Sequence, residues 1–125
     1  FLQSVLADFS ILPLAVGGAS PEQVAEVLNR VWGGEETLIV VSSDLSHFLT
    51  YAAAQQRDAV TVKAILDLNT HLVGEQACGA QPINGLALAA RQHGLQAHLL
   101  DLRNSGDTAG SKDQVVGYLA AAFVK

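Results

Sequence analysis

The feature that most constrains the fold is residues 37–41, Thr-Leu-Ile-Val-Val, a short apolar run rich in β-branched side chains. Such a run is typical of a central strand in a parallel sheet, where helices cover both faces. Polar residues follow at once in residues 42–47, Ser-Ser-Asp-Leu-Ser-His. Ligands of open α/β sheets bind beyond the carboxyl ends of the strands, so this hexapeptide predicts a strand-end pocket. The alternative is that Ser42, Ser43 or Asp44 only caps the next helix.

Helical and strand-like patterns alternate along the rest of the chain. We expect helices over residues 1–7, 20–32, 50–69 and 82–93, and strands over residues 9–16, 35–41, 96–102 and 114–124. The alanine-rich end of the last segment, 120–122, is equally compatible with a helix. This alternation predicts an α/β fold with a mixed, mostly parallel sheet flanked by helices.

Two of these helices carry more detailed expectations. Ser20, Pro21 and Gln23 form the pattern of a capping box with proline at the first helical position. In the 50–69 helix, one face is expected to pack on the sheet, and its side chains are Ala54, Ala59, Val62, Ile65 and Leu66. Asp58 is expected on the solvated face.

Composition limits the classes of protein and of partner. A length of 125 residues fits a single domain over residues 1–125. A formal net charge of -5 without a basic stripe disfavours nucleic acid as a partner. No apolar run approaches the roughly 18 residues of a membrane span, and no signal peptide opens the chain, so we expect no membrane association and a cytoplasmic location. Charged residues make up only 15% of the chain, which suggests a homo-oligomer interface or a missing part of the fold.

Three residues stand out as candidates for chemistry. Asp44 and His47 are three positions apart, so on the first turn of a helix or in the loop before it they share a face. They can then act as a base and its orienting partner, or as metal ligands. Cys78 precedes a predicted helix, whose positive end stabilises a thiolate that can bind a metal or attack an electrophile. The alternative for Cys78 is a buried, inert thiol in a turn.

A second polar stretch, residues 104–108, follows the strand predicted over 96–102. If the strands are parallel, Asn104, Ser105 and Asp107 line the same pocket as Asp44, with simple turn formation as a near-equal alternative. The histidines at 71, 93 and 98 are expected to have structural roles.

Four motifs in this order resemble the carboxyl-terminal half of the Memo family. They are residues 42–47 (Ser-Ser-Asp-Leu-Ser-His), 77–79 (Ala-Cys-Gly) with 82–83 (Pro-Ile), 104–107 (Asn-Ser-Gly-Asp) and 115–118 (Val-Val-Gly-Tyr). Memo proteins are similar in fold to the class III extradiol dioxygenases, which hold non-haem iron. The resemblance implies that this single domain is half of a longer Memo-like domain.

The resemblance also implies roles for the candidate residues. Cys78 corresponds to the cysteine metal ligand of the family, His47 to the acid/base histidine of the dioxygenases, and Asp44 to a position lining the same pocket. The remaining ligands of the family are two histidines in its amino-terminal half. We therefore expect iron to bind in the complete protein, and weakly or not at all to this chain alone.

Two functions follow from the resemblance. The first is a metal-dependent, dioxygenase-like oxidoreductase. The second is a non-enzymatic binding or scaffold protein that keeps the pocket for a small-molecule or peptide ligand. In the family this includes phosphotyrosine-peptide recognition in animals and association with radical-SAM and AMMECR1-like proteins in microbes. A hydrolase that uses Ser43 or Ser46 with His47 is disfavoured, because no Gly-x-Ser-x-Gly elbow is present.

Overall fold

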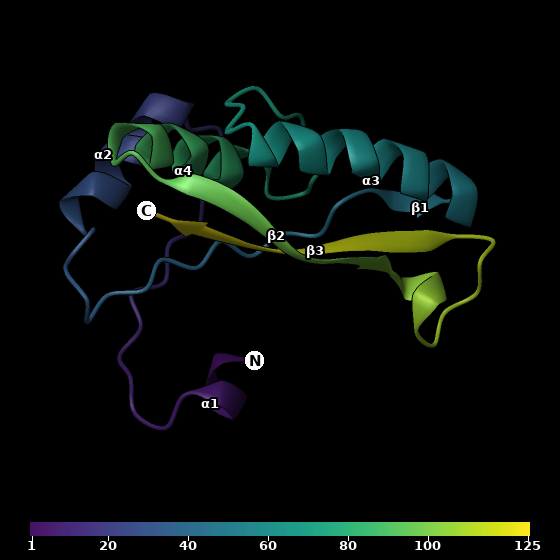
Figure 1. Cartoon of the computed structure of the whole chain (residues 1–125), viewed down its shortest axis with the longest axis horizontal. Coiled ribbons are helices and arrows are strands. Elements are labelled where there is room, and N and C mark those ends of the chain that lie inside the picture. Colours follow the sequence, from purple (N-terminus) through teal and green to yellow (C-terminus); the bar gives the residue numbers. More distant parts are fainter.

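The computed structural model describes residues 1–125 and contains four α-helices and three strands (Figure 1). The helices are α1 (Leu2–Val5), α2 (Pro21–Arg30), α3 (Tyr51–Leu66) and α4 (Ala80–Gln92). The strands are β1 (His47–Leu49), β2 (Gln96–Asn104) and β3 (Val115–Val124), and a short 3-10 helix, η1 (Ser105–Asp107), follows β2. The fold is α/β, as expected.

The sheet is antiparallel throughout, so the prediction of a mostly parallel sheet is wrong. Its strand order is β1-β3-β2, and β3 pairs antiparallel with both neighbours. The physical reason is the connection: β2 and β3 are consecutive and no crossover helix lies between them, and a short connection returns the chain antiparallel. The alanine-rich end of the chain belongs to β3 and pairs with β2, from Gln96↔Val124 to Asn104↔Gly117.

Two predicted strands do not form. Residues 9–16 and 35–41 form no strand and pair with no other strand. The 37–41 run has the side chains of a central strand, but a strand exists only beside a second strand that takes up its backbone hydrogen bonds. Its Leu38 and Val40 side chains are largely exposed.

The predicted helices are confirmed to within a few residues. At α2, the Ser20 hydroxyl accepts from the Gln23 amide at 3.3 Å, and the Gln23 side chain accepts from the Ser20 amide at 2.9 Å. The expected buried face of α3 is confirmed at Ala54, Val62 and Ile65 but wrong at Ala59, which is exposed.

Asp58 is the main exception on α3, because it is 3% exposed instead of solvated. Its carboxylate Oδ1 accepts a hydrogen bond from the backbone amide of Ser46 at 3.1 Å. A buried carboxylate needs such a partner. Asp58 therefore joins α3 to the segment that leads into β1.

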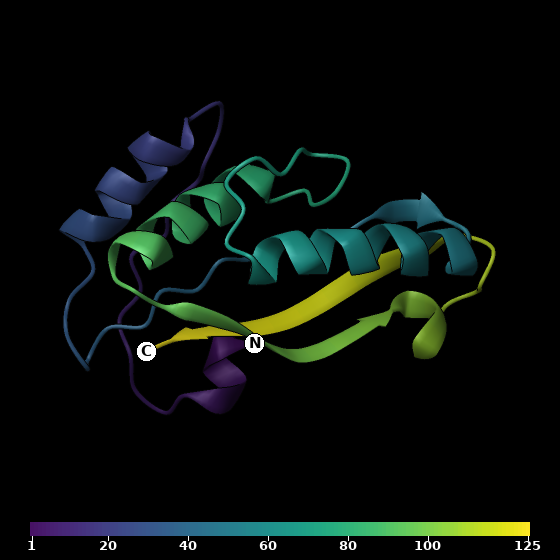
Figure 2. The same ribbon diagram turned by 45° about the horizontal axis from the view of Figure 1, so that its top comes forward.

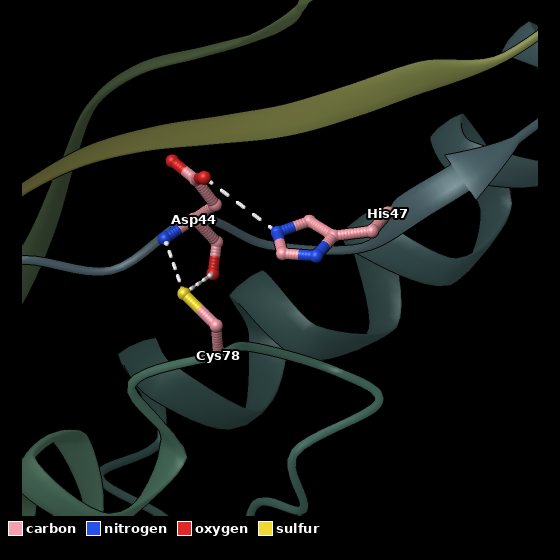
Figure 3. A group of neighbouring side chains, drawn as sticks. All are labelled: Asp44, His47 and Cys78. Carbon is pink, nitrogen blue, oxygen red and sulfur yellow. Dashed lines mark hydrogen bonds and ion pairs between the residues drawn. The ribbon is translucent and has the colours of Figure 1, made fainter.

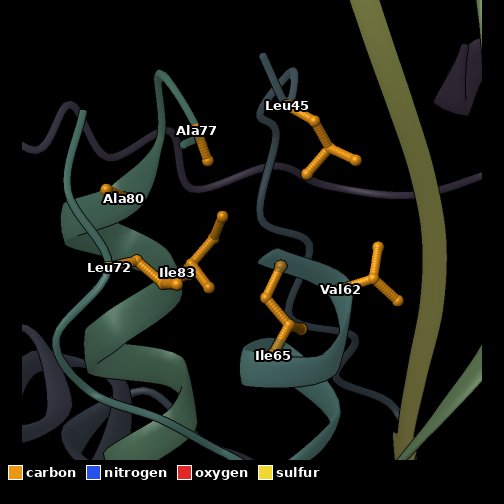
Figure 4. Close-up of a cluster of buried hydrophobic side chains, with 7 residues drawn as sticks. All are labelled: Leu45, Val62, Ile65, Leu72, Ala77, Ala80 and Ile83. Atoms are coloured by element: carbon orange, nitrogen blue, oxygen red, sulfur yellow. The ribbon is translucent and has the colours of Figure 1, made fainter. Parts of the chain in front are cut away.

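Helices α2, α3 and α4 lie on one side of the β2–β3 ribbon, and the amino-terminal segment runs along the other side (Figures 1 and 2). One hydrophobic cluster lies between α3, α4 and the segment before β1, and its buried members are Leu45, Val62, Ile65, Leu72, Ala77, Ala80 and Ile83 (Figure 4). A second cluster joins α2 to α4. No helix of this chain combines the length and apolar character that crossing a bilayer requires.

Candidate metal centre

Asp44, His47 and Cys78 come together at one end of the first hydrophobic cluster (Figure 3). Each offers one ligand atom, and the carboxylate oxygen, imidazole nitrogen and sulfur all lie within 4.8 Å of one another. The structure thus brings together the three residues that the sequence singled out.

Backbone hydrogen bonds hold the segment that carries Asp44 and His47. The Leu45 amide donates to the Gly117 carbonyl at 2.9 Å, and the Gly117 amide donates to the Ser46 carbonyl at 2.9 Å. Together with the bond from the Ser46 amide to Asp58, they fix the segment between β3 and α3. The position of the site therefore depends on tertiary contacts rather than on a local helix.

Of the two placements expected for Asp44 and His47, the helical turn is wrong, because Asp44 lies in the loop before β1 and His47 opens this strand. The two side chains still meet, with His47 Nε2 at 3.5 Å from Asp44 Oδ2. The next residue, Phe48, has a φ of 61°, and the pairing of β1 with β3 shifts between His47 and Leu49. Such irregularities re-aim side chains and are common beside functional sites.

Cys78 is held against the Asp44 segment by polar contacts. The Asp44 amide donates to the Cys78 sulfur at 3.2 Å. The Ser43 hydroxyl accepts from the Gly79 amide at 2.8 Å, donates to the Asp44 carbonyl at 2.7 Å and lies 3.7 Å from the sulfur. Ser43 therefore clamps the two loops together. Cys78 is exposed, so the alternative of a buried, inert thiol is wrong.

The donor set fits a transition-metal ion. Bond lengths of roughly 2.0–2.3 Å around a tetrahedral ion separate its ligand atoms by about 3.3–3.7 Å. The separation of 3.5 Å between His47 and Asp44 lies in this range, and the others need a movement of about 1 Å at most. Sulfur, imidazole and carboxylate ligands suit zinc and iron. The His47 and Asp44 side chains are 37% and 47% exposed, so an ion or a small ligand can reach them.

The loop with Asn104, Ser105 and Asp107 uses its polar atoms for its own structure. The Asn104 side chain accepts from the Gly106 amide at 2.9 Å, and Asp107 accepts from the Asn104 amide at 2.8 Å. The Ser105 hydroxyl accepts from the Val116 amide at 3.1 Å. None of these hydrogen bonds reaches the Asp44, His47 and Cys78 cluster, so the role of this loop as a pocket wall stays a prediction.

The same loop is tied to the start of α3. The Tyr51 hydroxyl donates to Asp107 Oδ1 at 2.5 Å. This hydrogen bond is the main reason that the pKa of Asp107 is lowered and the pKa of Tyr51 is raised. No feature of the sequence singled out Tyr51. For Asp58, in contrast, the spacing of four residues from both Ala54 and Val62 was a signal of a shared buried face.

The other histidines and the serine nucleophiles stay outside the cluster. His93 stacks on Trp32 with ring centroids 3.8 Å apart, and its Nε2 lies 2.8 Å from Asn29 Oδ1. The Ser46 hydroxyl is buried without a hydrogen-bond partner, and the Ser43 hydroxyl is engaged by Gly79 and Asp44. Neither hydroxyl is hydrogen-bonded to the His47 imidazole, so the structure offers no nucleophile–base pair for a hydrolase.

Comparisons with a family model and with individual relatives agree on one family. Residues 1–122 match the family described as "Memo-like protein". The "MEMO1 family protein" of Methanosarcina mazei is 33% identical over 126 aligned positions, and the alignment covers 90% of this chain and 47% of the relative. That of Aquifex aeolicus is 33% identical over 128 residues, covering 94% of this chain and 48% of the relative. The chain spans about half the length of the curated relatives it matches.

Proposed function

Because this chain belongs to the Memo family, we propose that it supplies one side of a metal site in a dioxygenase-like pocket. Cys78 is the proposed metal ligand, and His47 and Asp44 are the proposed acid/base pair. The observation that supports this most is the meeting of the three side chains within 4.8 Å, although Cys78 is 34 residues from Asp44 in the chain. A sulfur donor beside an imidazole–carboxylate pair is the chemistry that both roles require.

Each residue has a defined task in this proposal. The Cys78 sulfur already accepts the Asp44 amide hydrogen, which orients it toward the cluster. His47 accepts and returns a proton at Nδ1, the ring nitrogen that does not face Asp44, and the Asp44 carboxylate, 3.5 Å from Nε2, orients the ring. Acid/base contacts are often this long before substrate binds. A bound iron ion would supply the redox chemistry of the enzymes that the family resembles.

We further propose that this chain alone binds the metal weakly. Catalytic metal sites generally use at least three protein ligands. Here all three candidate ligands are at least partly exposed, and Asp44 and His47 are also proposed to act as a pair with each other. Calorimetric titration with ferrous or cobaltous ion tests this. We expect weak binding that Cys78→Ser abolishes and that His98→Ala, which changes an exposed histidine of β2, leaves intact. Tight binding that His71→Ala removes would show that the site is built otherwise.

The enzymatic role is tested by oxygen uptake with catechols in the presence of ferrous iron. Sustained turnover that His47→Ala removes would support the oxidoreductase. Metal binding without turnover would instead favour the alternative, a binding protein that keeps the pocket for a peptide, a small molecule, or partners such as radical-SAM and AMMECR1-like proteins. Immobilised phosphotyrosine peptide is the matching binding probe, with the unphosphorylated peptide as its control.

A further inference from the structure

Phe48 combines two features that destabilise a folded chain. Its φ of 61° lies in the left-handed region, which bulky L-residues rarely adopt because their Cβ atom approaches the following carbonyl oxygen. Phe48 is also 71% exposed, so burial of its ring offsets little of this strain. A glycine would adopt the same backbone conformation without strain. Folding alone therefore does not explain a phenylalanine at this position.

A β-bulge holds Phe48 in this conformation. His47 pairs with Val116 and Leu49 pairs with Val115, so Phe48 is an extra residue of β1 that has no partner on β3. Where a bulge contains a left-handed residue, that residue is usually glycine. Strained residues of other types persist mainly where a site uses their side chains.

Leu68 provides a contrast, because it is the other non-glycine residue with a positive φ, at 54°. It follows the carboxyl end of α3, where the Asn69 amide donates to the Ala64 carbonyl at 2.8 Å and the Leu68 amide donates to the Ile65 carbonyl at 3.0 Å. This pair of hydrogen bonds is the usual helix ending that places a residue in the left-handed region. Leu68 thus has a structural reason for its conformation.

The Phe48 ring lies beside the imidazole of His47. Their centroids are 5.6 Å apart and their planes make an angle of 60°, which fits the edge-to-face contacts found at about 4.5–7 Å. Neighbouring residues of a regular strand point to opposite faces, so the bulge is what lets the two rings meet. The His47 side chain, which faces Asp44 (Figure 3), is itself 37% exposed. The bulge therefore adds an exposed aromatic surface to a cluster of polar side chains.

We propose that Phe48 is a binding residue of the candidate site and receives an aromatic ring of the ligand, while a hydroxyl group on that ring bonds to His47 Nδ1. This proposal rests on the proposed function, because it requires the ligand to bind at His47. The exposed Phe48 ring offers stacked and edge-to-face contacts, which favour an aromatic ring over a saturated ring of the same size. The adjacent imidazole nitrogen offers a partner for a hydroxyl group. A phenol meets both requirements, either as a small molecule or as a tyrosine side chain.

NMR titration of this chain with p-cresol tests the proposal. We expect p-cresol to shift the ring signals of Phe48 and His47, and Phe48→Gly to raise its dissociation constant about twofold to tenfold. The saturated counterpart, 4-methylcyclohexanol, should bind the parent chain more weakly by a similar factor. Leu68→Gly is the matched control, because it replaces the other residue with a positive φ and should leave the affinity for p-cresol unchanged.

Urea unfolding separates ligand binding by Phe48 from a role in packing. Truncation of a buried phenylalanine strongly destabilises a protein. Phe48→Gly instead removes an exposed ring and relieves a strained backbone, so the urea midpoint should stay the same or rise. A fall as large as that for a buried phenylalanine would assign Phe48 to packing and overturn the proposal.

The remaining outcomes are equally decisive. Equal affinity for p-cresol and 4-methylcyclohexanol would overturn the proposal, as would an affinity for p-cresol that Phe48→Gly leaves unchanged. A dimer of this chain that Phe48→Gly dissociates would also overturn it, because Phe48 would then contact a second copy. Tighter binding of the peptide Gly-Tyr-Gly than of p-cresol would support the proposal with a tyrosine side chain as the source of the ring, and the reverse would support it with a small phenol.

The metal titration described above tests the proposed function separately, since Phe48 offers no metal ligand. Absence of p-cresol binding, both with and without cobaltous ion, would overturn the role of Phe48. Metal binding that depends on Cys78 would still stand in that case.

Discussion

Replacing Gly79 by alanine should separate the two loops of the candidate metal centre. A Cβ atom at this position would lie 2.7 Å from Ser43 Cβ and 3.0 Å from the Ser42 carbonyl oxygen. Any residue can adopt the Gly79 φ of -94°. The alanine side chain is therefore opposed by its contacts with Ser42 and Ser43 and not by the backbone conformation. Relief to an ordinary carbon–carbon distance of at least ~3.5 Å requires a shift of nearly 1 Å.

The expected loss of stability follows from this close contact. Overpacking at a tight site costs about 1–3 kcal/mol, and the hydrogen bond from the Gly79 amide to Ser43, now 2.8 Å, is weakened as well. A shift of this size also adds to the movement of about 1 Å that the ligand atoms already need to reach metal-binding distances. We therefore expect the free energy of unfolding to fall by about 1–3 kcal/mol and the weak cobalt affinity to fall below detection.

Urea unfolding measures the first effect, and the sulfur-to-cobalt charge-transfer absorption measures the second. Gly74→Ala is the matched control, because a Cβ at Gly74 meets nothing within 4 Å. The double variant Ser43→Gly/Gly79→Ala removes the Ser43 side chain and should recover about 1 kcal/mol relative to additivity. An unchanged stability of Gly79→Ala, or no recovery in the double variant, would refute the packing argument.

Two further predictions concern hydrogen bonds of the segments that flank the candidate site. Asp58→Ala leaves the buried Ser46 amide without its acceptor and should lower the free energy of unfolding by about 1–3 kcal/mol. Urea unfolding measures this change. Asp58→Asn keeps an acceptor oxygen and should lower the free energy of unfolding by less. At the Tyr51–Asp107 hydrogen bond, the folded state lowers the pKa of Asp107. Its stabilising contribution is thus present above the ordinary carboxyl pKa of about 3.9 and is lost as the pH falls through the lower folded-state value. The urea midpoints of the parent chain and of Tyr51→Phe should differ at neutral pH and converge in strong acid, and a difference that does not change with pH would contradict this.

Local sequence signals predicted the local elements well. The capping box at Ser20 and Gln23 marked the start of α2, and the apolar periodicity of α3 and α4 placed both helices within a few residues. These signals succeed because they depend on hydrogen bonds and side-chain spacing inside one segment. Such local signals do not predict which distant segments pair with each other.

Long-range pairing accounts for the errors. Residues 37–41 have the composition of a central strand, yet no second strand lies beside them. The parallel arrangement was inferred from alternating elements, whereas β2 and β3 follow each other directly. Asp58 was assigned to solvent because of its charge, but the Ser46 amide that it accepts from is 12 residues away. Sequence spacing alone does not reveal that partner.

The sequence singled out the three residues that come together, but it did not predict their geometry. The family resemblance grouped Asp44, His47 and Cys78, and the structure brings them together. The Asp44–His47 contact was expected on a helical turn or in the loop before it, whereas a loop that enters a strand with irregular pairing produces it. Ser43 was named as a residue of the strand-end pocket, as a possible helix cap and as a disfavoured nucleophile, but its role in holding the two loops together was not predicted.

The loops that Ser43 clamps together are expected to separate before the β2–β3 ribbon unfolds. The β2–β3 ribbon joins strands that follow each other in the chain, so its closure costs little entropy. The contact between Asp44 and Cys78 closes a separation of 34 residues and depends on a few hydrogen bonds among partly exposed groups. Such contacts open without global unfolding. We therefore expect the candidate metal donors to exchange between gathered and separated states, so that a measured metal affinity would include the free energy of gathering them.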